Sequence, residues 1–180
     1  MIFATVGTHE QPFDRLLQEL DRLVEGGTIT EPVLIQASHC TYAPRHCTVE
    51  ALLPYDQMEH SFATARIAIT AAGPATIMQA LKHGKVPIVV PRQSTFGEHV
   101  DDHQVRFARR MADRVLVVED IADLGPTLTT YDVRTAGLRA DAYGPERARV
   151  FARRFEALCE EVLARPRVPR LRTWILGPRG

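Results

Sequence analysis

The chain has 180 residues, of which 45% are hydrophobic and 24% are charged. These values are ordinary for a globular domain with its own core and exclude a disordered, collagen-like or coiled-coil chain. Twenty-two basic residues balance twenty-two acidic ones, so the broad positive surface of a nucleic-acid-binding protein is absent and we expect no nucleic acid among its partners.

The first elements follow from apolar spacing. Residues 2–6 are a β-branched run typical of a strand, and apolar residues then recur every three or four positions over 13–24, which predicts a helix. Pro12 suits the first turn of that helix, and Gly26-Gly27 suit its end.

The same alternation continues along the chain. Further strands are predicted at 33–37, 49–53, 66–70, 86–90 and 114–118, with helices at 56–65, 74–83 and 99–111 and irregular stretches at 38–48 and 125–144. The runs 88–90 and 115–118 are apolar on both faces, as in strands that helices cover on each side of a parallel sheet. We therefore predict an α/β fold with a doubly wound, Rossmann-like parallel sheet.

The C-terminal part differs in charge and pattern. Residues 147–180 hold nine arginines and three glutamates, a net charge of +6, which leaves −6 for residues 1–146. Val150, Phe155, Leu158 and Val162 form an apolar stripe at helical spacing. We expect a main domain over residues 1–145 and a basic helix and tail over residues 146–180.

The sequence shows no membrane span and no secretory leader. No run approaches the roughly 20 apolar residues that a transmembrane helix needs, and Met1 leads directly into the first strand without a basic segment. We expect a cytoplasmic protein, in which Cys40, Cys47 and Cys159 are free thiols.

Ligands of open parallel sheets bind beyond the carboxyl ends of the strands. The first such loop is Gly7-Thr8-His9-Glu10, which leads into the start of a helix, where free N–H groups favour an anion. The loop Gly73-Pro74-Ala75-Thr76 has the same placement after the fourth strand, and it suits a diphosphate. The alternative for both loops is an ordinary strand-to-helix turn.

Neither loop carries a dinucleotide fingerprint or a P-loop. An NAD-dependent oxidoreductase therefore has little support.

The densest polar cluster is 91–104, after the fifth strand. It ends in Asp102-His103-Gln104, whose carboxylate, imidazole and amide suit the hydroxyls of a sugar. The alternative is a solvated helix start. His99 and His103 are four residues apart, which on a helix would let both face a metal, but His-Val-Asp-Asp-His is not the zincin pattern.

A second group of residues has side chains that can bind metals but lacks the spacing of a known metal site. It comprises His39, Cys40, His46 and Cys47, which lack a compact Cys-x-x-Cys pair. We predict neither a metal ion nor a cofactor.

Three segments of the chain resemble a known family. The first is 6–16, which begins Val-Gly-Thr-His-Glu-Gln-Pro, and the second is 72–78, Ala-Gly-Pro-Ala-Thr-Ile-Met. The third is 84–104, which ends Gly-Glu-His-Val-Asp-Asp-His-Gln. Together they resemble the C-terminal domain of family 28 glycosyltransferases over about residues 1–125. They are most similar to the small donor-binding subunits of two-component bacterial exopolysaccharide glycosyltransferases and of the dolichol-pathway N-acetylglucosaminyltransferase. The resemblance implies one lobe of a GT-B enzyme.

The resemblance also implies roles for individual residues. Gly7, Thr8 and the loop Gly73 to Thr76 would face the diphosphate of a UDP-sugar, and Asp102, His103 and Gln104 would face its sugar. Gln79 occupies the position of a ribose-binding glutamate, and Ala71 that of a histidine or arginine; both depart from the family pattern.

Transfer would be inverting, and a general base is needed for it. Within this chain, His9 and Glu98 are the candidate bases; the partner lobe is the other possible source.

The same resemblance implies partners. The second lobe would be a membrane-associated subunit that presents a lipid-linked sugar acceptor, and it would hold this chain at the inner face of the membrane. The basic C-terminal segment suits an acidic partner or anionic headgroups. In isolation, the partner-facing surface could pair two copies as a homodimer. The alternative function is a non-catalytic, regulatory module that binds a nucleotide sugar, with Gln79 and Ala71 as signs of lost turnover.

Overall fold

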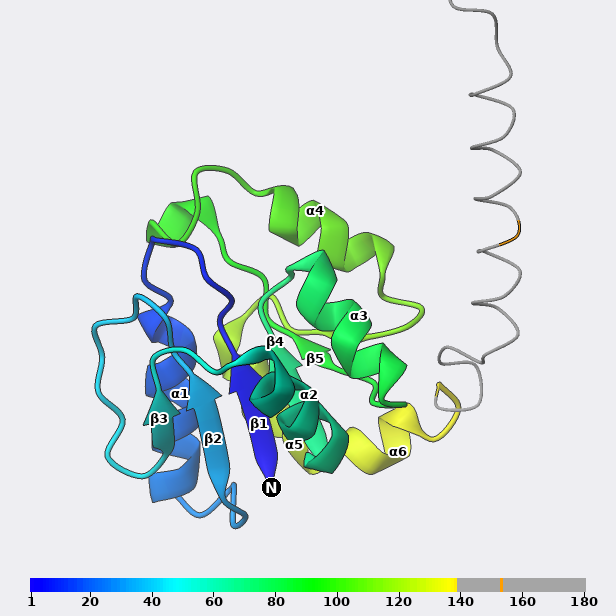
Figure 1. Cartoon of the computed structure of the whole chain (residues 1–180), viewed down its shortest axis with the longest axis horizontal. Coiled ribbons are helices and arrows are strands. Elements are labelled where there is room, and N and C mark those ends of the chain that lie inside the picture. Colours follow the sequence, from blue (N-terminus) through cyan, green and yellow to red (C-terminus); the bar gives the residue numbers. More distant parts are fainter. Residues whose placement is uncertain (139–152, 154–180) are drawn as a thin grey trace, which may run out of the picture. The chain divides into compact units, whose positions relative to one another are not determined.

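The computed structural model describes residues 1–138 and residue 153 (Figure 1). Residues 1–138 belong to the compact unit Met1–Tyr143. The helix and tail expected over 146–180 fall outside the described residues apart from residue 153, so the domain division remains a prediction. No helix in the part of the chain that the structure describes is long and apolar enough to span a bilayer.

A six-stranded parallel sheet forms the centre of this unit, and its strand order is β3-β2-β1-β4-β5-β6. The strands are β1 (Ile2–Thr5), β2 (Val33–Gln36), β3 (Thr48–Glu50), β4 (Ile67–Thr70), β5 (Ile88–Val89) and β6 (Leu116–Val117). The chain runs outward from β1 to one edge, returns to β4 and then runs to the other edge. This confirms the predicted doubly wound, Rossmann-like sheet.

Helices cover both faces of the sheet (Figure 1). They are α1 (Asp14–Glu25), α2 (Tyr55–Thr64), α3 (Pro74–Lys82), α4 (His103–Arg110), α5 (Leu124–Thr129) and α6 (Tyr131–Thr135), with short 3₁₀ turns η1 (Ser94–Phe96) and η2 (Ile121–Asp123). Side chains alternate across β1: Ile2 and Ala4 join the core beneath α1 and α5, whereas Phe3 packs with Phe62 of α2.

The largest part of the core lies between α1 and the sheet. Leu16, Leu17 and Leu20 of α1 are 0% exposed, and each such side chain contributes about 1.5–3 kcal/mol relative to an exposed one. Because this burial fixes the face that α1 presents, it also fixes where the loop before α1 leaves the sheet.

The strand register brings the last residues of all six strands into one row. Thr5 is paired with Gln36 and with Thr70, and the row continues to Glu50 on one side and through Val89 to Val117 on the other. All the loops that follow the strands therefore start from one edge of the sheet.

Three predicted strands are shorter than expected, because β3 ends at Glu50 and β5 and β6 span two residues each. Two further segments differ in kind. The helix expected over 99–111 begins only at His103, because Asp101 Oδ1 accepts the His103 N–H at 2.9 Å and competes with a helical bond. The break expected over 125–144 is wrong for its first part, which forms α5 and α6. There, the buried Leu124, Leu128 and Tyr131 form a helical stripe that the nearby Gly and Pro concealed.

Candidate functional site

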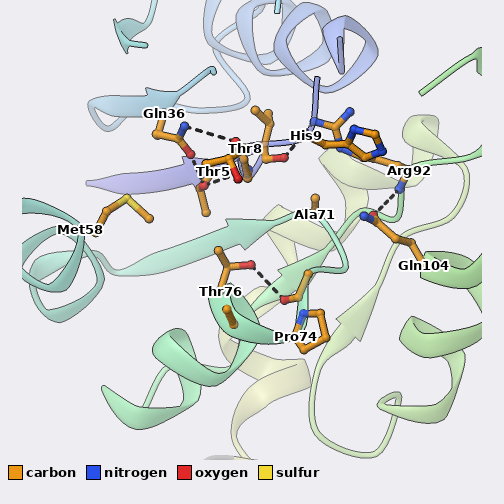
Figure 2. Close-up of a pocket in the computed structure, with 14 residues that line it drawn as sticks. Thr5, Thr8, His9, Gln36, Met58, Ala71, Pro74, Thr76, Arg92 and Gln104 are labelled. Carbon is orange, nitrogen blue, oxygen red and sulfur yellow. Dashed lines mark hydrogen bonds between the residues drawn. The ribbon is translucent and has the colours of Figure 1, made fainter. Parts of the chain in front are cut away.

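A cavity of about 350 Å³ opens at the carboxyl edge of the sheet (Figure 2). Its lining comes from the ends of β1 and β2, the loop after β1, the turn from β4 into the start of α3, and single residues of α2, of the loop between β5 and α4, and of α4. These residues are Thr5, Val6, Gly7, Thr8, His9, Gln36, Met58, Ala71, Gly73, Pro74, Ala75, Thr76, Arg92 and Gln104. A cavity of this size at this position is typical of a small-ligand site.

The loop after β1 is held by polar strand residues. The Thr5 hydroxyl donates to Gln36 Oε1 at 2.5 Å, and the Gly7 N–H donates to Thr5 Oγ1 at 3.2 Å. Gln36 Nε2 in turn donates to the Gly7 carbonyl at 3.3 Å. Gly7 has a φ of +75°, which side-chain-bearing residues rarely adopt. This network fixes the path of Gly7, Thr8 and His9 along the cavity.

The first turn of α3 forms the opposite part of the lining. Gly73 precedes Pro74, the first residue of the helix, and the Thr76 hydroxyl donates to the Gly73 carbonyl at 3.1 Å. The N–H groups of Ala75 and Thr76 belong to the first turn, where no intrahelical acceptor exists. Together with the helix dipole, these N–H groups favour an anion in the cavity.

The backbone conformation at position 73 does not require glycine. Its φ is −78° and its ψ is 126°, a conformation that any residue adopts. A methyl group built on it would meet Thr76 Oγ1 at 3.4 Å. An alanine here would therefore fit the fold, and its methyl group would lie beside Thr76, which also lines the cavity.

Arg92 is a buried cation in the cavity wall, with 1% of its surface exposed. Its guanidinium donates to three backbone carbonyls, those of Gln11 (2.6 Å), Glu98 (3.1 Å) and Val6 (2.9 Å). Burial lowers the pKa of Arg92. The side chain thereby joins the loop after β1 to the loop after β5 and places a positive group beside the proposed anion site.

Glu98 does not line the cavity. It is 3% exposed, and its two oxygens accept from Arg15 Nε at 2.8 Å and Arg15 Nη2 at 3.0 Å. The backbone N–H of Gln93 adds a further bond to Glu98 at 3.0 Å. This bidentate pair joins α1 to the loop after β5, which is a positioning role.

Of the predicted triplet, Gln104 alone lines the cavity. Its Oε1 accepts the Arg92 N–H at 3.1 Å (Figure 2), which orients the amide so that Nε2 can donate to a ligand. Asp102 instead accepts the N–H and the hydroxyl of Ser94, both at 2.9 Å. His103 Nδ1 lies 2.6 Å from Asp101 Oδ1.

His9 lies in the cavity lining and contacts a second histidine. Its ring meets that of His99 edge-on, with 4.2 Å between centroids, and the His99 ring meets that of His103 at 4.4 Å. Burial and the two neighbouring imidazoles lower the pKa of His99 below its ordinary value, although Asp101 opposes this. His9 is therefore the candidate base that reaches the cavity.

Gln79 lies on α3 outside the cavity lining, and its Nε2 donates to Glu59 Oε1 at 3.3 Å. Ala71, the other departure from the family pattern, does line the cavity. The sequence therefore identified the two loops and Gln104 as neighbours. It missed Thr5, Gln36 and Met58, and it gave Arg92 no role; polar residues at the ends of apolar strands were the available signal.

Among the described residues, the cysteines and histidines of loop 38–47 do not form a cluster that could hold a metal ion. Cys40 Sγ accepts the Phe13 N–H at 3.3 Å, whereas His46 contacts Asp21. Cys40 and Cys47 are free thiols, as expected, and burial raises the pKa of Cys47 to about 11. Cys159 lies outside the described residues.

These features define a Rossmann-like domain with a ligand cavity at the carboxyl edge of its sheet. Residues 1–131 match the model of the glycosyltransferase family 28 C-terminal domain. The chain therefore belongs to this family, and its fold is that of a single GT-B C-terminal lobe. A search of the curated proteins finds no match.

Two solved structures are similar in fold. MurG from Acinetobacter baumannii is 21% identical with a TM-score of 0.49, over 72% of this chain and 40% of that one. The glycosyltransferase of kitacinnamycin is 17% identical with a TM-score of 0.51, over 85% of this chain and 42% of that one. This chain thus spans less than half the length of each.

Proposed function

We propose that this chain is the UDP-sugar-binding, catalytic subunit of a two-component inverting hexosyltransferase. The observation that supports this most is the single cavity lined by Gly7 and Thr8, by Gly73 to Thr76, and by Gln104. Its loops come from two neighbouring strands, β1 and β4, which is where a parallel sheet reverses its winding direction and binds nucleotides.

The diphosphate would lie at the start of α3. The N–H groups of Ala75 and Thr76 and the helix dipole would stabilise the charge that develops on the leaving UDP. Arg92 adds a buried positive charge to the same cavity wall. The sugar would reach Gln104, whose Nε2 is oriented by the Oε1 bond to Arg92.

In the reaction, an acceptor hydroxyl forms a new bond to the anomeric carbon while the bond from that carbon to the UDP oxygen breaks. UDP leaves with the electron pair, and a base takes the hydroxyl proton. In this chain His9 is the base that we propose, because it lines the cavity whereas Glu98 is held by Arg15. A base on the partner is the competing source.

The partner would supply the second lobe. We place the acceptor-binding site on that separate subunit. We propose that this subunit is membrane-associated, presents a lipid-linked sugar in exopolysaccharide or lipid-linked oligosaccharide synthesis, and holds this chain at the cytoplasmic face. Without it, a homodimer would use the same surface.

The test is isothermal titration of the full chain with UDP and with UDP-hexoses, alone and with a membrane-associated companion protein encoded beside it. Binding of UDP with a stoichiometry of one, and sugar transfer only with the companion, are expected. Absence of UDP binding both with and without the companion would overturn the proposal.

The second candidate is a non-catalytic module that binds a nucleotide sugar and regulates another protein. The departure at Gln79 favours it, because an amide lacks the charge that strengthens hydrogen bonds to ribose hydroxyls and this amide donates to Glu59 outside the cavity lining. Gln79→Glu separates the two functions: faster transfer with the companion favours the enzyme. UDP binding without product from any donor favours the module.

A further inference from the structure

We propose that His99, Asp101 and His103 bind a divalent first-row transition-metal ion such as Zn²⁺. One donor atom from each of these side chains lies within 4.8 Å of the other two. Within residues 1–138 and 153, this is the one group of three or more histidine, cysteine, aspartate or glutamate side chains that meets this condition.

The backbone that makes this arrangement is not the one predicted from the sequence. A helix over 99–111 would place His99, Asp102 and His103 on one face and turn Asp101 away from them. Instead α4 begins at His103, and the preceding turn brings Asp101 between them. Asp101 Oδ1 lies 2.6 Å from His103 Nδ1 and 3.7 Å from His99 Nδ1.

These separations fit an ion after a small adjustment. Zinc bonds of about 2.0–2.2 Å place tetrahedral ligands roughly 3.3 Å apart, which lies between the two distances from Asp101. Two imidazole nitrogens and one carboxylate oxygen are also the ligands of zinc sites in which the fourth coordination position is left for water or substrate. Bonds to the ion would replace the bond between Asp101 and His103 and the bond that His99 Nδ1 accepts from the Asp101 N–H at 3.4 Å.

The surroundings hold one ligand firmly and leave the other two accessible. The His99 side chain is 10% exposed, and its ring lies in edge contact with those of His9 and His103. The side chains of Asp101 and His103 are about half exposed, so an ion can enter from solvent. Because His9 lines the cavity, the site lies one ring away from it.

The experiment is calorimetric titration of the full chain, freed of metal with EDTA, with ZnCl₂. The matched absorption titration uses CoCl₂, because cobalt bound by thiolate gives an intense ultraviolet charge-transfer band that nitrogen and oxygen ligands do not. We expect one ion per chain and no thiolate band. Asp101→Asn and His103→Ala should each weaken zinc binding by at least about tenfold.

His60→Ala is the control, because His60 is exposed on α2 and outside the cluster. It should bind zinc as the unaltered chain does, and circular dichroism should show that every variant is folded. The proposal is overturned by an absence of saturable zinc binding, by unchanged affinity in both cluster variants, or by a thiolate band. UDP binding plays no part in these outcomes, so they are independent of the proposed transferase function.

Discussion

Replacing Gly73 by alanine tests whether this glycine is needed for ligand binding or for the stability of the fold. Gly73 lines the cavity at the start of α3 with a φ of −78°, so alanine fits the backbone. The substitution adds one methyl group where we place the diphosphate. We therefore expect UDP binding to fall while the fold is retained.

The magnitude follows from the local structure. The new methyl group would meet Thr76 Oγ1 at 3.4 Å, an ordinary contact. Alanine restricts the unfolded chain, which stabilises by about 0.4–1 kcal/mol, but it is a poorer residue than glycine before a helix by a similar amount, roughly 0.5–1 kcal/mol. These effects nearly cancel, so the free energy of unfolding should change by less than about 1 kcal/mol.

The assay pairs urea denaturation with calorimetric titration of UDP. A Kd at least tenfold higher, equivalent to about 1.4 kcal/mol, is expected for Gly73→Ala. Gly137→Ala is the matched control, since a methyl group there has no neighbour within 4 Å and Gly137 is outside the cavity. Gly7→Ala should differ from both, because its φ of +75° adds strain of roughly 1–2 kcal/mol.

Unchanged UDP affinity in a folded Gly73→Ala protein would refute the placement of the diphosphate at α3. Loss of stability well above 1 kcal/mol, with binding lost only in proportion, would refute the claim that Gly73 serves the ligand rather than the fold.

Three further predictions concern single side chains. Glu98→Gln should lower the free energy of unfolding in urea by about 2–4 kcal/mol, because Arg15 loses a buried partner; a change below about 0.5 kcal/mol would contradict this. Gln104→Leu should weaken a bound UDP-hexose about tenfold but UDP little, by calorimetry; equal losses would place Gln104 away from the sugar. Burial raises the pKa of Asp21, but bonds from Tyr42 and two backbone N–H groups outweigh it and hold the pKa below its ordinary value. That stability is present above the unfolded pKa of about 3.9 and is lost as the pH falls through the lower folded value. Between pH 4 and 2, the free energy of unfolding of Asp21→Asn should therefore fall less steeply than that of the unaltered chain. An equally steep fall would contradict this.

Much of the fold was predictable because it depends on local apolar patterns. The strands are short apolar runs and α1 has a continuous apolar stripe, so the alternating order and the parallel sheet followed. Ends of elements were less predictable. At α4, the Asp101 carboxylate bonds the His103 N–H, and the spacing of apolar residues contains no signal for such a bond.

The site was predictable only where its residues follow strands directly. Gly7 and Gly73 do so, and the structure places both on one cavity. Arg92 is different, because a lone arginine is ordinarily a surface residue, and its burial depends on carbonyls from two loops. The Thr5–Gln36 bond likewise depends on the register of β1 with β2, which the sequence alone does not define.

The proposed function requires that the loop after β1 and the start of α3 bind one nucleotide diphosphate together. Titration of ¹⁵N-labelled full chain with UDP, followed by amide NMR shifts, tests it most directly. We expect the largest shifts on Gly7, Thr8, Gly73, Ala75 and Thr76. Shifts confined to another cavity, at the opposite end of β1 and lined by Thr28 to Glu31 and Arg66, or an absence of any shift at saturating UDP, would contradict it.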